Sequence, residues 1–357
     1  MSVVPAQPGS QSQPTLSVLD TPSADWDQFV LSHSDASVYF LSGWARLAHE
    51  VFGHSAFFLE AREPGGQLSG VLALVRQRSI LGNFMTSLPF FNYGGACCTQ
   101  PQVALELMQR GQALAEQLGC SYVEYRDVES RPGEWQVRTD KVSMILALPA
   151  DCDTLAKQLG SKLRSQIKRT EREQAVVHKG GAELLDAFYE VFSENMRDLG
   201  TPVYPKRFFR AVLARFPDKA RIVVIDHGSR PAAAGFLIRH AGRAEIPWAA
   251  CSAHAKPLGF NMKLYWEVLV DSIEQGCGSF DFGRSTPDSG TYRFKKQWGA
   301  QPLQLHWHRW ERGRPADATA APMSESGAMR LATAVWKKLP LPIANLLGPW
   351  LSPGLPW

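Results

Sequence analysis

Residues 280–299 read FDFGRSTPDSGTYRFKKQWG, and this stretch decides the fold. It begins as a short strand in which Phe280 and Phe282 share one face and Asp281 occupies the other, because side chains alternate along a strand. A turn rich in Gly, Ser, Thr, Pro and Asp follows, and a cationic, aromatic segment completes the stretch. Polar groups directly after a strand are typical of ligand sites in open α/β sheets. The stretch therefore predicts an α/β fold with a site around Asp281.

The same order of elements occurs twice in the chain, which predicts an internal duplication. The two long helices are expected at residues 102–118 and 259–275. Each ends near a glycine, a residue that readily caps a helix, and each is followed by a strand that alternates aromatic with acidic residues. The matching segments read EQLGCSYVEYR at 116–126 and EQGCGSFDFGR at 274–284. We expect a first module over residues 16–150, and a second module with the catalytic cleft over 151–312.

The motif at 280–299 resembles the signature of the Fem-type peptidyl and acyl transferases, in which Phe or Tyr more often stands at the position of Trp298. The resemblance covers about residues 35–310. It implies mixed α/β sheets in two tandem modules of the GNAT acyltransferase fold, and an acyl or aminoacyl transferase activity. Residues 194–209 resemble the corresponding stretch in one branch of the Fem-like proteins, which is associated with exopolysaccharide and exosortase (PEP-CTERM) loci. That branch implies an amino-sugar, glycan-precursor or peptide-like acceptor in cell-envelope or exopolysaccharide metabolism.

Acyl transfer needs a deprotonated nucleophile and a stabilised oxyanion, which defines the catalytic candidates. Asp281 is the expected base or orienting group, although a salt bridge to Arg284 or Lys295 is the alternative. Tyr292 could donate a proton to the leaving group or simply pack, and Lys295 could neutralise a phosphate or an oxyanion. The resemblance also implies catalysis that relies on the substrate itself, without a side-chain base.

The expected substrate site draws on several segments that resemble cleft residues of the Fem-type proteins. Residues 88–95, LPFFNYGG, contain two glycines that allow a close backbone approach to a ligand, or alternatively a hydrophobic turn between the modules. Residues 161–172 carry cations four residues apart, as a phosphate grip or a solvated helix face. The full set of substrate-binding candidates is Asn92, Tyr93, Gly94, Gly95, Lys162, Arg164, Lys168, Tyr204, Trp248, Arg284, Ser285, Lys296 and Trp298.

The acyl donor is left open between aminoacyl-tRNA and acyl-coenzyme A. GNAT proteins hold the donor pyrophosphate at a helix start, which makes Gly259 and Asn261 the donor-binding candidates. Only one glycine occurs there, so an ordinary helix start is the alternative. No tightly bound cofactor is expected. Six cysteines without zinc spacing predict no metal site and a reduced, cytoplasmic protein.

Composition and termini bound the remaining possibilities. The chain has 357 residues and a formal net charge of +4, which by itself does not predict nucleic-acid binding. Residues 1–15 are expected to be disordered. Residues 313–357 form a linker and an apolar tail, with Trp336 beside two lysines and no charge from Leu339 onward. Such a tail predicts either peripheral contact with the inner membrane or packing on the protein itself.

Two rival functions remain beside transfer to a phosphate-bearing or glycan acceptor. The first is an acetyl-coenzyme A-dependent N-acetyltransferase, which binding of coenzyme A would favour. The second is a non-catalytic ligand-binding or scaffold protein that uses the same cleft. Full function after substitution of Asp281, Tyr292 and Lys295 together would favour the second.

Overall fold

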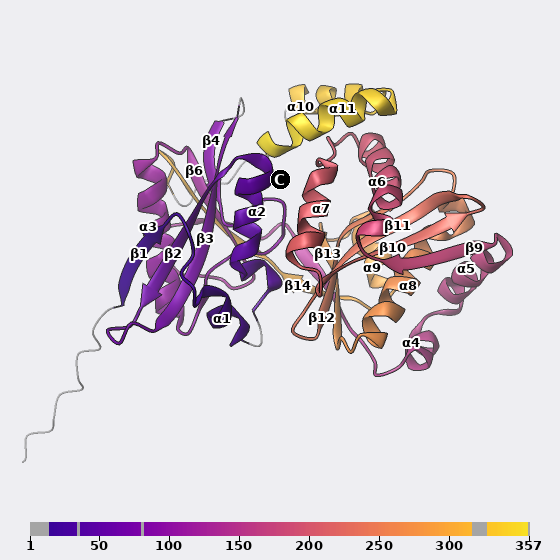
Figure 1. Cartoon of the computed structure of the whole chain (residues 1–357), viewed down its shortest axis with the longest axis horizontal. Helices are drawn as coiled ribbons and strands as arrows, with labels where there is room; N and C mark the ends of the chain where they lie inside the picture. Colours follow the sequence, from indigo (N-terminus) through magenta and orange to yellow (C-terminus); the bar gives the residue numbers. More distant parts are fainter. Residues whose placement is uncertain (1–13, 34–35, 80–81, 316–326, 356–357) are drawn as a thin grey trace, which may run out of the picture.

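The computed structural model describes residues 14–33, 36–79, 82–315 and 327–355 (Figure 1). Most of the predicted disordered N-terminus lies outside the described residues, and Thr15 already begins strand β1. Two mixed α/β modules lie side by side, each with helices on both faces of its sheet (Figure 1). This arrangement confirms the predicted fold class.

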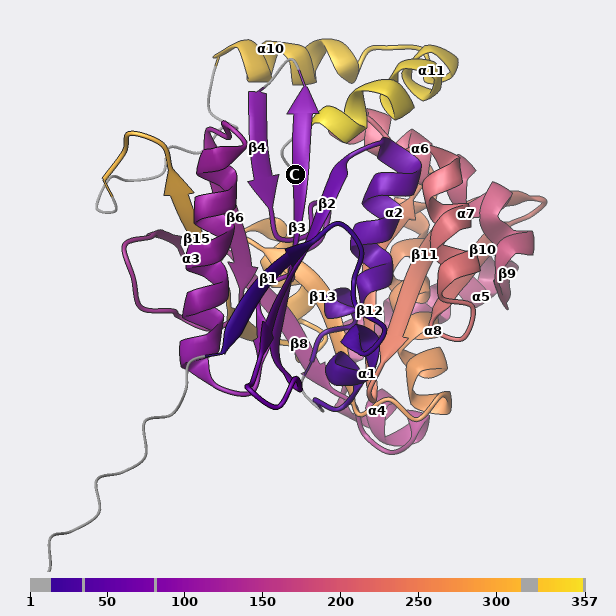
Figure 2. The same ribbon diagram turned by 60° about the vertical axis from the view of Figure 1, so that its left-hand side comes forward.

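The first sheet has the strand order β1-β2-β3-β4-β6-β15-β7, with β5 paired to β3. Among the described strands of this sheet, only β4 and β6 run parallel. Helix α3 covers one face, while α1, η1 and α2 belong to the other (Figure 2). The elements are β1 Thr15–Leu19, α1 Trp26–Leu31, η1 Val38–Phe40, α2 Ser42–Phe52, β2 Ser55–Arg62, β3 Leu68–Ser79, β4 Gly82–Thr86, β5 Cys97–Cys98, α3 Pro101–Gln117, β6 Tyr122–Asp127, β7 Gln136–Arg138 and β15 His306–Glu311.

The second sheet has the order β14-β8-β13-β12-β11-β10-β9, and of its strands in the described ranges only β12 and β13 run parallel. Helix α8 packs on one face and α6 on the other. The elements are β8 Val142–Ala147, α4 Cys152–Gln158, α5 Ser161–Arg172, β9 Ala175–Gly180, η2 Ala182–Leu184, α6 Leu185–Leu199, α7 Lys206–Arg215, β10 Ala220–His227, β11 Arg230–His240, β12 Arg243–Cys251, η3 Lys256–Leu258, α8 Phe260–Glu274, β13 Ser279–Ser285, α9 Gly290–Lys296 and β14 Gln301–Gln304.

The two modules repeat one plan, in which a long helix joins the two parallel strands. Helix α3 connects β4 to β6, and α8 connects β12 to β13. Both helices lie within one residue of their predicted bounds. The modules nevertheless exchange strands across the predicted boundary at residue 150. Strand β8 precedes that boundary yet pairs in the second sheet, and β15 returns from the second half to pair in the first.

An aromatic core joins the modules into one unit. Trp44 of α2 stacks on Phe216 at 4.5 Å between ring centroids, and Phe91 packs on Trp248 of β12 at 5.6 Å. Large aromatic side chains contribute much of the apolar area that a core buries. Gly43 lets α2 approach the second module, since a Cβ atom there would lie 2.9 Å from the Phe216 ring. The surfaces on either side of the module boundary are therefore held at a fixed separation.

The C-terminal tail folds back across both modules. It contains α10 Gly327–Trp336, α11 Leu341–Leu351 and η5 Ser352–Gly354, above the ends of β3 and β4 in Figure 2. The Gln77 side-chain amide donates to the carbonyl oxygens of Pro353 and Leu355, and the Ser79 hydroxyl donates to Gly354 O. One face of the tail thus packs on the protein itself. None of the helices described is long and apolar enough to cross a membrane.

Candidate functional site

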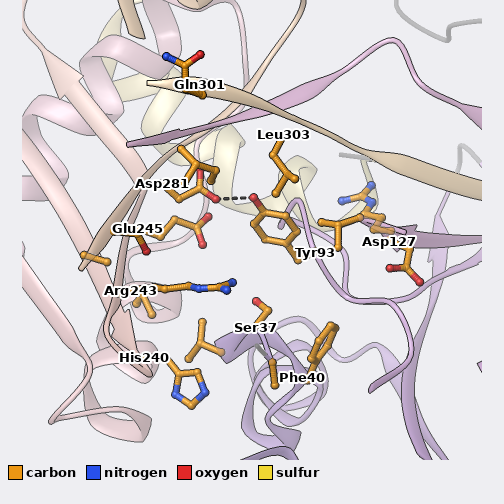
Figure 3. A pocket seen from close by; sticks show the side chains of 18 of the residues that line it. Ser37, Phe40, Tyr93, Asp127, His240, Arg243, Glu245, Asp281, Gln301 and Leu303 are labelled. Atoms are coloured by element: carbon orange, nitrogen blue, oxygen red, sulfur yellow. Dashed lines mark hydrogen bonds between the residues drawn. The ribbon is translucent and has the colours of Figure 1, made fainter. Parts of the chain in front are cut away.

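A cavity of about 490 Å³ lies between the two modules (Figure 3). The first module contributes Ser37 and Phe40 from the η1 region, together with Tyr93 from the 88–95 loop. The second module contributes the ends of β11 and β14 and the adjoining parts of β12 and β13. Pockets of about 300–1,000 Å³ are typical of small-molecule sites. The cavity is therefore large enough for a substrate and is built from both modules.

Two carboxyl groups lie side by side on the cavity wall. Glu245 of β12 is the register partner of Asp281 of β13, and parallel pairing places both side chains on the same face of the sheet. Both point toward the cavity in Figure 3. After Asp281 the pairing of β12 with β13 ends, so the two strands diverge. The acidic pair thus stands where the parallel strands separate.

Three donors orient the carboxylate of Asp281. The Tyr93 hydroxyl donates to Oδ2 at 2.5 Å, and the Ser143 hydroxyl donates to Oδ1 at 2.7 Å. The third donor is the backbone N–H of Gly283, also at 2.7 Å from Oδ1. Gly283 has φ +76°, and the pairing of β13 with β8 shifts register at this point. Because glycine adopts this left-handed conformation at little cost, it allows the bulge that turns its own N–H toward Asp281.

Burial raises the pKa of both carboxyl groups, because the charged form loses its hydration. The neighbouring Asp281 charge raises the pKa of Glu245 further, whereas the Tyr93 and Ser143 hydrogen bonds oppose the shift at Asp281. The Tyr39 hydroxyl faces Glu245 without reaching full hydrogen-bond geometry. We therefore assign the negative charge of the pair to Asp281 and the proton to Glu245. Such a pair can accept a proton from a bound substrate.

Lys295 supports the end of β13 from behind the acidic pair. Its ammonium group donates to Gly283 O at 2.8 Å and to Arg284 O at 2.9 Å. Burial lowers its pKa to about 8, against the opposing effect of the Asp281 charge. Lys295 therefore holds the bulge that carries the Asp281 donor. The neighbouring Lys296 is exposed, and its ammonium group lies 5.9 Å from the centroid of the Tyr292 ring. Tyr292 packs against the core of the second module and does not line the cavity.

An arginine cluster surrounds the Trp307 ring next to the cavity. The guanidinium groups of Arg126, Arg284 and Arg138 lie 4.3, 4.9 and 5.6 Å from the ring centroid. Glu124 pairs with Arg126 at 3.1 Å and with Arg138 at 3.7 Å. Surrounding protein atoms and the nearby Arg126 charge lower the pKa of Arg284 to about 10. Arg138 also pairs with Asp140 at 3.4 Å, so three cations face two carboxylates, and the one surplus positive charge suits an anionic group.

The 88–95 loop is held in a strained backbone conformation. Leu88 and Phe90 have φ angles of +66° and +80°, which cost roughly 1–3 kcal/mol each for residues other than glycine. A Cβ atom on Gly94 would lie 2.0 Å from Ser87 O, and one on Gly95 would lie 2.8 Å from the Asp127 carboxyl. Both glycines therefore serve internal packing in this structure. Half-buried Asn92 lies near Gly283, while Tyr93 reaches the acidic pair.

Four other substrate-binding candidates are buried away from the cavity lining. Tyr204 and Trp248 belong to the aromatic core between the modules. Trp298 packs against Phe282 in the core of the second module. The Ser285 hydroxyl is buried without a hydrogen-bond partner. None of these four side chains lines the cavity.

The cationic helix and the donor-binding candidates lie on the outer side of the second module. Lys162, Arg164 and Lys168 are exposed on α5, at the edge farthest from the first module (Figure 1). Helix α5 packs against α8, and a Cβ atom on Gly259 would lie 2.8 Å from Gln166 O. The Gly259 N–H donates to Lys256 O and the Phe260 N–H to Ala255 O. Asn261 is half-buried in the first turn of α8.

Several site residues escaped sequence reasoning. Glu245 is an acidic residue within the strand sequence RAEIPWAAC, and an acid flanked by apolar residues in a strand is a signal that could have identified it. Tyr39 and Ser143 carry no such signal, because only the tertiary fold brings them to the acidic pair. The internal repeat could have identified Arg126, because it occupies the position in the first module that Arg284 occupies in the second. No metal-binding group of three or more His, Cys, Asp or Glu occurs in the part of the chain that the structure describes.

Residues 157–296 match the family model of the acetyltransferase (GNAT) domain. No curated protein matches the chain in sequence. Among solved structures the fold is similar to FemX, with a TM-score of 0.61 and 12% identity over 83% of this chain and 97% of FemX. It is also similar to L-PGS from Bacillus licheniformis, with a TM-score of 0.53 and 13% identity over 90% of this chain and 99% of that one.

A third similar structure is a tandem GNAT protein from the clavulanic acid biosynthesis pathway, with a TM-score of 0.52 and 11% identity over 84% of this chain and 99% of that one. At such identities the likeness shows the fold alone. Residues 157–296 thus match an acetyltransferase (GNAT) domain in sequence, and the chain as a whole shares the tandem fold of FemX.

Proposed function

We propose that the chain transfers an acyl or aminoacyl group to an amine of an acceptor bound in the cavity between the modules. The observation that carries this proposal is the pair of buried Glu245 and half-buried Asp281, which line the cavity where the parallel strands separate. The amine nitrogen attacks the carbonyl carbon of the donor, and a C–N bond forms. The bond to the donor oxygen or sulfur then breaks, the amine proton passes to Asp281, and the leaving group takes up a proton.

The proposed acceptor carries a phosphate or another anion beside its amine. Arg126 lines the cavity, and it shares the Trp307 ring with Arg138 and Arg284. Guanidinium groups form bidentate contacts with phosphate, which suits such an acceptor. Amino-sugar, glycan-precursor and peptide-like acceptors of cell-envelope or exopolysaccharide metabolism meet this description. The resemblance of residues 194–209 to the exosortase-associated branch supports that class.

The second candidate is an N-acetyltransferase that uses acetyl-coenzyme A, and the acetyltransferase domain match at 157–296 favours it. Two assays separate the donors: thiol release from acetyl-coenzyme A, and ester hydrolysis or transfer from a mixture of charged tRNAs. Each is run with a panel of phosphorylated amino sugars and short peptides. Acceptor-dependent consumption of one donor identifies the reaction. If neither donor is consumed while an acceptor binds, the ligand-binding alternative replaces the transferase.

Substitution of Asp281 tests its proposed role as the general base. Asp281→Asn should lower kcat by roughly 10²–10⁴-fold, the usual contribution of a general base. Asp186→Asn removes an exposed carboxyl on α6 and is the matched control that should keep full activity. Wild-type turnover by Asp281→Asn would show that the substrate provides its own base.

A further inference from the structure

The C-terminal hairpin of α10 and α11 presents an apolar face to the outside of the protein. Leu346 is 76% exposed and Trp350 is 79% exposed, far more than large apolar side chains usually are. The other large exposed apolar residues of the hairpin are Leu331, Val335, Ile343 and Leu347. Several exposed large apolar residues on one such hairpin are typical of an interaction site.

The opposite face holds the hairpin firmly against the body. Ala344 and Gly348 are buried, and a Cβ atom on Gly348 would lie 2.9 Å from the backbone nitrogen of Val203. The Asn345 amide donates to the Ser193 hydroxyl at 3.2 Å. The inner face of the hairpin thus fixes its orientation on the body.

The charge of the hairpin is of one sign. Residues 327–355 contain Arg330, Lys337 and Lys338 and no Asp or Glu. Both lysines are exposed at the turn between α10 and α11, beside Trp336. Apolar residues with flanking Trp and Lys match the chemistry of a bilayer surface, where the apolar groups enter the acyl boundary and the cations meet anionic headgroups.

We propose that the outward face of α10 and α11 docks the protein on an anionic lipid bilayer. A cavity of about 560 Å³ lies between the hairpin and the first module, and Trp336 and Arg78 are among the residues that line it. The exposed Trp350 also borders this cavity, next to the outward face. The cavity offers an acyl chain an apolar recess with a cation at its edge. Docking does not depend on the proposed acyl transfer, because the hairpin lies away from the acidic pair.

The test is flotation with vesicles of phosphatidylcholine, alone or mixed with phosphatidylglycerol. The full chain should float with the anionic vesicles and bind the neutral ones less. Leu346→Glu combined with Trp350→Glu should weaken binding by at least about tenfold, because two apolar groups leave the interface. Lys337→Glu with Lys338→Glu should remove the preference for phosphatidylglycerol. Leu31→Glu, at an exposed leucine of α1, is the control that should float like the wild type.

Three results would overturn the proposal. The first is a full chain that never floats with anionic vesicles, and the second is a Leu346→Glu/Trp350→Glu variant that floats as well as the wild type. The third is a wild-type dimer in solution that the same variant converts to a monomer, which would assign the face to a second copy of the chain. Circular dichroism of the variants should match the wild type, since the substituted side chains are exposed.

Discussion

Tyr93→Phe is the substitution that most directly probes the acidic pair. It removes a single hydroxyl that donates to Asp281 Oδ2 at 2.5 Å and leaves the ring in place. A hydrogen bond to a charged group contributes roughly 1.5–3 kcal/mol. At about 1.4 kcal/mol per pKa unit, its loss should raise the pKa of Asp281 by about 1–2 units. The base would then be protonated over a wider acidic range.

The assay is the pH dependence of kcat/KM with the donor and acceptor that the activity screens identify. The acidic limb should move to higher pH by about 1–2 units in Tyr93→Phe, while the rate at the alkaline plateau changes less. Tyr125→Phe is the matched control, because Tyr125 is also buried but its hydroxyl donates to Met108 O in the core of the first module. It should leave the profile unchanged. An unshifted limb in Tyr93→Phe, with Asp281→Asn inactive, would refute Asp281 as the group that titrates.

Three further predictions follow from the charges. Glu245→Gln should lower activity, yet it should raise the thermal unfolding midpoint when that is measured above pH 7. Because the pKa of the buried Glu245 carboxyl is raised, the folded wild type loses stability as the pH rises above the usual pKa of a glutamate, and glutamine cannot ionise. An unchanged midpoint would contradict this. Arg284→Gln should weaken binding of inorganic phosphate or a phosphorylated acceptor about tenfold or more by calorimetry, with Lys296→Gln as the exposed control. Burial lowers the pKa of His308 to about 4, so the free energy of unfolding should fall as the pH drops from about 6.5 to 4, by up to roughly 3 kcal/mol. Chemical denaturation of His308→Gln over the same pH range should show a smaller fall.

The fold was largely predictable because its signals are local. Each long helix carries its own apolar periodicity and a glycine beyond its end, so the bounds of α3 and α8 follow from the sequence within one residue. The exchange of β8 and β15 was not predictable, because strand pairing depends on contacts between residues far apart in the chain. A strand sequence such as HWHRWE at β15 carries no information about which sheet receives it.

The site was predictable only where polar residues follow a strand or a glycine pair. Asp281 and Tyr93 were found in this way, and the structure brings them together at 2.5 Å across the module boundary. The aromatic candidates Trp248 and Trp298 illustrate the opposite case, since a large aromatic side chain near a motif serves the core as readily as a ligand. The cations of α5 form the predicted stripe, but no local signal places that helix on the outer side of its module.

The exchanged strands also constrain how the chain can fold during synthesis. When a ribosome has released the first 150 residues, the first sheet still lacks β15, which lies between β6 and β7. Strand β8 has emerged by then, but its partners β13 and β14 have not. Neither sheet is complete until residues beyond 300 are available. Strand pairing over such long sequence separations is slow, because the chain must first lose the conformational entropy of the intervening loop. The two modules should thus mature together once residue 311 has emerged, with a dependence on chaperones that two independent domains would not have.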